Sequence, residues 1–125
     1  MNITWIDSDI ELQSLLHDMV GCERYALDTE FHRERTYFPQ LALIQIKHNK
    51  KIYLIDPIAV DLALFGDLFG SDSLCVLHAA QQDLEVLNHA CGSAPSRIFD
   101  TQIAAGFVGM STPSLSSLIL SELKV

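Results

Sequence analysis

The sequence contains no apolar stretch as long as the roughly 18–20 residues that a membrane-spanning helix requires. Its first residues, MNITWIDSDIELQ, lack the basic segment followed by an apolar segment that marks a secretory signal peptide. Cysteine is scarce, since the three cysteines are widely spaced and form no CxxC pair. These absences predict a cytoplasmic protein with reduced thiols, no membrane partner and no disulfide framework.

The sequence also lacks internal repeats, low-complexity tracts and linker-like segments. Its 125 residues are 49% hydrophobic and 19% charged, which is typical of a globular chain. A chain of this length buries one core of useful size. We therefore expect residues 1–125 to form a single domain.

Basic residues are few. The sequence has 16 acidic and 8 basic side chains, with a net charge of −8. Composition alone argues against a nucleic-acid-binding protein, because phosphate contacts require Lys and Arg. However, six of the eight basic residues lie between Arg24 and Lys51. This cluster is either a solvated surface or a site for phosphate contacts.

The pattern of apolar residues predicts an α/β fold. A helix over 8–21 begins with a capping box at Ser8 and Glu11. Three strands follow over 25–31, 41–47 and 51–57, and HNK forms a hairpin-length connection between the last two. Further segments alternate between helix (61–70, 79–92, 101–109, 113–123) and strand (73–78, 96–100). This order predicts a mixed sheet flanked by helices, with an antiparallel three-strand meander and parallel crossover strands.

Two carboxylates lie in the middle of the strand-like run ALDTEF. Asp28 and Glu30 alternate along it, so both point to the same side of the sheet. Two adjacent anions repel each other unless a cation compensates them, and carboxylate oxygens suit Mg²⁺ or Mn²⁺. Alternatively, the strand lies at an exposed edge, where Arg33 or Arg35 pairs with the acids.

A third carboxylate strengthens the metal interpretation. Asp83 lies in the first turns of the helix after SLCVLH, a strand that we expect beside the first one. Asp28, Glu30 and Asp83 can then converge, although an acid near a helix start is also favoured by the helix dipole. Asp100 precedes the helix at TQIAA, where a helix cap is the more common role than a metal ligand.

At these residues the sequence resembles a known family. ALDTEFHRERTYFPQLALIQI is similar to the first exonuclease motif of the ribonuclease D family, within the DEDD group of 3′–5′ exonucleases. LHAAQQDLEVL resembles the second motif, with Asp83 at the position of its acid. LIDP and FDTQIAA match segments between and after these motifs, so the resemblance runs from about Trp5 to Val125.

The resemblance implies a ribonuclease H-like fold and metal-dependent hydrolysis of RNA from its 3′ end, with release of nucleoside 5′-monophosphates. It implies that Asp28, Glu30 and Asp83 are the catalytic residues and hold two divalent ions, Mg or Mn. The implied partners are single-stranded RNA 3′ ends and transfer-RNA precursors. Nearby residues that we expect to contact the RNA are Phe31, His32, Arg33, Arg35 and His78.

One part of the family pattern is missing. The family has a fourth acid, preceded four positions earlier by a Tyr or His that orients or deprotonates the attacking water. After Asp100 this sequence contains no Asp, Tyr or His, and Glu122 is its only acid. We therefore expect a C-terminally incomplete exonuclease domain, truncated before the last helices, with little activity by itself. The alternative is a non-catalytic RNA-binding module with the nuclease fold.

Overall fold

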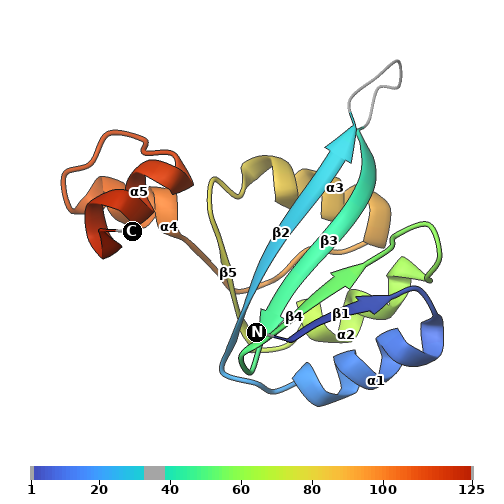
Figure 1. Cartoon of the computed structure of the whole chain (residues 1–125). Coiled ribbons are helices and arrows are strands. Elements are labelled where there is room, and N and C mark those ends of the chain that lie inside the picture. Colours follow the sequence, from blue (N-terminus) through green and yellow to red (C-terminus); the bar gives the residue numbers. More distant parts are fainter. Residues whose placement is uncertain (1, 33–38, 125) are drawn as a thin grey trace.

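The computed structural model describes residues 2–32 and 39–124 (Figure 1). In this part of the chain the strands are β1 (Asn2–Ile6), β2 (Arg24–His32), β3 (Gln40–His48), β4 (Lys51–Ile55), β5 (Leu74–Leu77) and β6 (Ile98–Asp100). The helices are α1 (Asp9–Met19), α2 (Gly66–Phe69), α3 (Gln81–Cys91), α4 (Thr101–Phe107) and α5 (Leu115–Leu123), and a 3₁₀ turn, η1 (Leu62–Phe65), precedes α2. No helix in these residues has the length and apolar character needed to cross a membrane.

The strands form one mixed sheet in the order β1-β4-β3-β2-β5-β6. Strands β2, β3 and β4 are antiparallel neighbours, which confirms the predicted meander. Strand β5 pairs with β2, and β6 pairs with β5, both in parallel, as predicted for the crossover strands. The predicted α/β architecture is therefore confirmed, and β2 lies between an antiparallel neighbour, β3, and a parallel neighbour, β5.

The prediction that the first element is a helix is wrong, because β1 precedes α1. Strand β1 lies parallel to β4 in the register Asn2↔Lys51 to Ile6↔Ile55. Its partner is far away in the sequence, and of its five residues Ile6 alone is buried. An edge strand of this kind has little local signal, because its stability comes from a non-local ladder.

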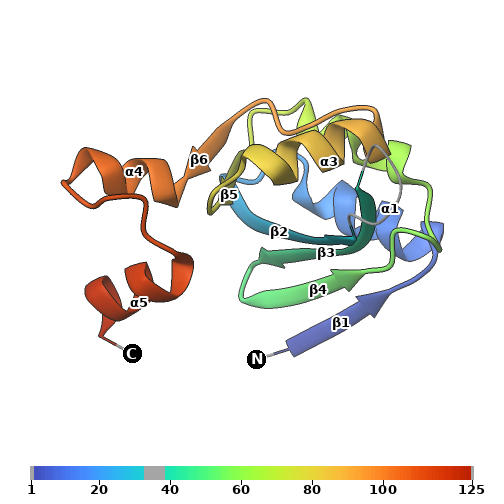
Figure 2. The ribbon, with the colours of Figure 1, turned by 90° about the horizontal axis from the view of Figure 1, so that it is seen from above.

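One face of the sheet is covered by helices. Figure 2 shows α1 and α3 on the same side of the strands, while α4 and α5 extend beyond the β6 edge. Leu12, Leu15, Leu16 and Met19 of α1 are buried, as are Tyr25, Leu27 and Thr29 of β2. Because strand residues alternate between faces, the intervening residues of β2 point to the opposite, open face.

A tight turn joins β3 and β4. Its two residues, Asn49 and Lys50, have φ values of 51° and 64°. Two positive φ values in succession give the turn the twist that matches two antiparallel strands. Asn tolerates this conformation well, whereas Lys pays a steric cost.

The three cysteines are free thiols, as predicted. Burial raises the pKa of Cys75 and of Cys91 to about 12. At Cys75, Tyr25 lowers the pKa and the charge of Asp83 raises it, but burial has the larger effect. At neutral pH both thiols therefore stay protonated, and they serve as small apolar residues of the core.

Candidate active site

The alternation of β2 places two carboxylates on the open face. Asp28 and Glu30 are exposed, while Thr29 between them is 6% exposed and points into the covered side. Neither acid uses its side chain in a hydrogen bond or ion pair with another residue in the described ranges. The two carboxylates are therefore accessible to a ligand from solution.

The third predicted acid comes from α3 and is buried. Asp83 is 7% exposed, and its Oδ1 accepts a short hydrogen bond from the Thr29 hydroxyl. Burial raises the pKa of Asp83, the bond from Thr29 opposes this, and the negative charge of Asp28 raises the pKa further. Asp83 therefore lies close enough to Asp28 for the two charges to interact.

The position of α3 follows from the length of the parallel pairing. Strand β5 pairs with β2 only from Arg24 to Ala26. Beyond this point β5 ends at Leu77 and α3 begins at Gln81, so the first turn of α3 lies beside the remaining part of β2. This arrangement brings an acid of a helix next to the acids of the central strand.

The donor set suits a divalent cation, although it is not assembled as a finished site. Three carboxylates are hard oxygen donors of the kind that Mg²⁺ and Mn²⁺ prefer. Burial, and after it the negative charge of Asp28, raises the pKa of Asp83, and a bound cation would offset both effects by stabilising the ionised carboxylate. In residues 2–32 and 39–124, however, no group of three or more His, Cys, Asp or Glu has the geometry to hold a metal ion.

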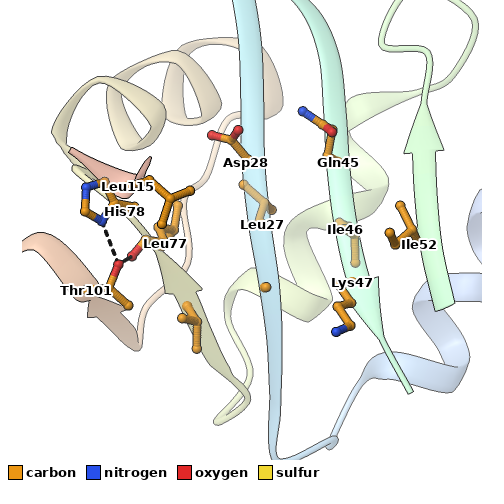
Figure 3. Close-up of a pocket in the computed structure, with 12 residues that line it drawn as sticks. Leu27, Asp28, Gln45, Ile46, Lys47, Ile52, Leu77, His78, Thr101 and Leu115 are labelled. Atoms are coloured by element: carbon orange, nitrogen blue, oxygen red, sulfur yellow. Dashed lines mark hydrogen bonds between the residues drawn. The ribbon is translucent and has the colours of Figure 1, made fainter. Parts of the chain in front are cut away.

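A pocket of about 500 Å³ adjoins Asp28 on the open face (Figure 3). Gln45 lies directly opposite Asp28 on β3, and Lys47 lies opposite Ala26. Sequence reasoning did not select Gln45 or Lys47 as site residues. The signal that identifies them is the alternation in QIK once the register with β2 is known, because cross-strand partners share a face.

His78 lines the far side of this pocket. Its Nδ1 lies 2.8 Å from the Thr101 hydroxyl (Figure 3). Its Nε2 lies 3.0 Å from the Pro113 carbonyl oxygen. Both ring nitrogens therefore have protein partners, which connect the end of β5 to α4 and to the segment before α5. The predicted RNA contact through His78 stays a prediction.

The other residues predicted to contact RNA lie at or beyond the end of β2. Strand β2 extends to His32, one residue further than expected, and its register with β3 shifts between Glu30 and Phe31. Phe31 is half-buried and packs against the core. Arg33 and Arg35 lie outside the described residues.

Asp100 has the role predicted as the more common one. It is the N-cap of α4, where its carboxylate accepts hydrogen bonds from the backbone N–H groups of Gln102 and Ile103. Thr29 and its bond to Asp83 were missed, because the sequence alone does not show which strand residue faces the first turn of α3.

Comparisons with known proteins identify the family and the fold. A family model described as 3′–5′ exonuclease matches residues 3–125. Ribonuclease D of Desulfotalea psychrophila (strain LSv54 / DSM 12343) is 41% identical over 123 residues, which are 95% of this chain and 33% of that protein.

Two solved structures give the same result for the fold. The crystal structure of Escherichia coli RNase D, an exoribonuclease involved in structured RNA processing, matches with a TM-score of 0.93 and 36% identity, over 100% of this chain and 34% of that one. Brucella melitensis NrnC with bound Mg²⁺ matches with a TM-score of 0.80 over 100% of this chain and 63% of that one, and its 22% identity supports the fold alone.

The chain spans about a third of the length of the ribonuclease D proteins that it matches. The match to the family model nevertheless includes every strand and helix of the described residues, except Asn2 of β1. The expected ribonuclease H-like fold is confirmed by the E. coli structure. From the sheet, the acids and these comparisons together, the chain belongs to the 3′–5′ exonuclease family and is similar to ribonuclease D.

Proposed function

We propose that this chain is the metal-binding part of a 3′–5′ exoribonuclease, which hydrolyses RNA from its 3′ end to nucleoside 5′-monophosphates. The observation that carries the proposal is the juxtaposition of the exposed Asp28 and Glu30 with Asp83 of α3. Similarity to ribonuclease D supports RNA as the substrate class. Transfer-RNA precursors are the finer substrate that we propose.

Each acid has a distinct role in the proposal. Asp28 and Glu30 approach a cation from the open face, and Asp83 supplies a ligand oxygen from the edge of β2. Thr29 holds one oxygen of Asp83, which leaves the other oxygen to turn toward Asp28. When bound, two Mg²⁺ or Mn²⁺ ions would stabilise charge on the attacking and leaving oxygens of the phosphodiester. The Mg²⁺ in the NrnC structure is consistent with such an ion.

The proposed metal site also explains how a chain with a negative net charge can act on RNA. A net charge of −8 repels RNA, whereas two divalent cations outweigh the charge of the three carboxylates and present a positive charge to the scissile phosphate. The phosphate contact then does not depend on Lys or Arg at the reacting group.

The test is a nuclease assay on the complete gene product with a 5′-labelled single-stranded oligoribonucleotide and Mn²⁺ or Mg²⁺. We expect a ladder of products shortened from the 3′ end, release of nucleoside 5′-monophosphates, and full inhibition by EDTA. Asp28→Asn, Glu30→Gln and Asp83→Asn should each reduce the rate by on the order of 10²–10³-fold, the scale for losing one stabiliser of transition-state charge.

Glu85→Gln is the matched control for Asp83→Asn. Glu85 lies on the same helix, is exposed and has the same charge, so its loss should leave the rate within about 2-fold of the parent. A gene product that binds the oligonucleotide but releases no nucleotide with either metal would instead be the non-catalytic RNA-binding module.

The 125-residue chain by itself gives a second test. No Asp, Tyr or His follows Asp100, so the chain offers neither the family's fourth acid nor its water-orienting residue. General-base help is worth roughly 10²–10⁴-fold. We therefore propose that the isolated chain releases nucleotides at least about 100-fold more slowly than the complete gene product under the same conditions.

A further inference from the structure

Asp100 contacts two helices at once. Besides capping α4, its Oδ1 accepts a hydrogen bond of 3.0 Å from the backbone N–H of Ala79, and its Oδ2 accepts one of 2.7 Å from that of Ala80. The bonds to Gln102 and Ile103 measure 2.8 and 3.4 Å. One carboxylate therefore collects four N–H groups from the beginnings of α3 and α4.

The beginning of α3 depends on this distant residue because it has no side-chain cap of its own. Ala80 occupies the N-cap position and offers no acceptor. Ala79 has a φ of 54°, a left-handed conformation that is unfavourable for a residue with a Cβ. A neighbouring contact must compensate this strain, and the Asp100 carboxylate is the group that binds this segment.

The charge state of Asp100 favours these four hydrogen bonds. Burial by itself would raise its pKa, but the N–H groups of Ala80, Gln102, Ala79 and Ile103 together lower the pKa below its ordinary value. Asp100 is therefore ionised at neutral pH, and hydrogen bonds to an ionised acceptor are the stronger kind.

We propose that Asp100 is a positioning residue for the metal site, because it fixes the first turn of α3 and thereby the place of Asp83 beside Asp28 and Glu30. The inference deepens the proposed function and rests on it. Asp83 is only three residues from Ala80, and the bond from Leu84 N–H to the Ala80 carbonyl, 2.9 Å long, continues the helix from the same point. Displacing Ala79 and Ala80 therefore displaces Asp83.

Thr29 and Asp100 act on Asp83 from two directions. Thr29 holds the carboxylate itself, whereas Asp100 holds the backbone from which the side chain extends. Neither residue is a proposed metal ligand, and Asp100 is part of β6 and the start of α4 rather than of α3. Partners that orient metal ligands typically change metal affinity by about 10–100-fold when they are lost.

The informative variant is Asp100→Asn. Asn is as good a helix cap as Asp, and its single oxygen can keep the three N–H contacts that Oδ1 makes. Its amide nitrogen then faces the N–H of Ala80, donor against donor, in place of Oδ2. The variant therefore preserves the cap of α4 and disturbs the beginning of α3.

We would measure Mn²⁺ affinity by electron paramagnetic resonance and amide hydrogen exchange by NMR in the complete gene product. In Asp100→Asn we expect about 10-fold weaker Mn²⁺ binding and faster exchange at Ala80 and Leu84, with unchanged exchange in α4. Ser8→Ala is the control for general destabilisation, since it removes the cap of α1. It should lower Tm but leave Mn²⁺ affinity unchanged.

The outcomes separate the two proposals. Unchanged Mn²⁺ affinity and unchanged exchange in Asp100→Asn would overturn the positioning role and leave the nuclease proposal standing. A parent protein that binds no Mn²⁺ and degrades no RNA would overturn the proposed function. In that case amide hydrogen exchange at Ala80 would still test whether Asp100 holds the beginning of α3. A measurement without any variant is the scalar coupling across the hydrogen bonds from Ala79 and Ala80 to the Asp100 carboxyl carbon, and its absence would contradict the inference.

Discussion

The three consecutive residues Asp28, Thr29 and Glu30 divide their tasks by the side of the sheet that they face. Asp28 and Glu30 are exposed on the open face, while Thr29 is buried and bonds to Asp83. Because strand side chains alternate, a single short segment supplies two ligands and the support for a third. The cost is a buried carboxylate whose pKa is raised.

That cost predicts a stability effect with a defined pH dependence. The folded-state pKa of Asp83 is raised above its ordinary value of 3.8 by burial, against the bond from Thr29, with a further increase from Asp28. Ionised Asp83 therefore destabilises the folded state, and this loss grows as pH rises from 3.8 through the folded-state pKa. Asp83→Asn should raise Tm at pH 7 in EDTA, and the gain should vanish below pH 3.8.

Thermal unfolding followed by circular dichroism across this pH range tests the prediction, with Glu85→Gln as the variant that should show no such gain. A lower Tm for Asp83→Asn at pH 7 would mean that the carboxylate is stabilising in the folded chain. In that case the charge at the site would already be compensated without a cation.

The candidate acids of this site could be selected from the sequence more easily than the residues that hold them in place. Asp28 and Glu30 followed from alternation within one strand, which is a local property. Thr29 and Asp100 act through contacts between segments that are distant in the sequence. Such contacts depend on where β5 ends and on how α3 returns to the sheet, and neither is encoded in a local pattern.

At the scale of elements, most boundaries could be predicted because the signals are local. The cap of α1 at Ser8, the positive φ of Gly21 after α1 and of Gly92 after α3, and the meander all agree with the sequence. Strand β1 was missed because its single buried residue, Ile6, gives no alternating pattern of burial, and its partner β4 is non-local. The segment predicted as one helix over 61–70 is η1 followed by α2.

The hairpin between β3 and β4 offers a stabilising substitution. Lys50 adopts a φ of 64° in the turn, and Asn-Gly is the preferred pair for such a turn. Lys50→Gly should therefore increase the free energy of unfolding by about 0.5–1 kcal/mol. Urea denaturation measures the effect, and Lys51→Gly is the control, because the same change at the first residue of β4 should destabilise the chain by a similar amount.

At the scale of the whole molecule, charge predicts how RNA binding depends on metal. The chain carries 16 acidic and 8 basic side chains, so without a divalent cation its net charge opposes RNA binding. We expect a single-stranded oligoribonucleotide to bind at least about 10-fold more tightly in Ca²⁺, which takes oxygen ligands as Mg²⁺ does, than in EDTA. Fluorescence anisotropy at constant ionic strength measures this difference.

Asp28→Asn combined with Glu30→Gln should abolish the difference between Ca²⁺ and EDTA. It should also slightly strengthen binding in EDTA, because two negative charges are removed from the open face. Tight binding in EDTA that does not change with these substitutions would place the RNA on another surface and would contradict the proposed site.

The parallel pairing of β1 with β4 has a consequence for biosynthesis. Asn2–Ile6 leaves the ribosome before the other strands of this sheet, yet its ladder cannot form until Lys51–Ile55 has also emerged. At about 5–20 residues per second, the nascent strand waits for several seconds before Ile6, its one buried residue, can be covered. Strand β1 can therefore join the sheet only after the three strands of the meander have been synthesised, although it precedes them in the sequence.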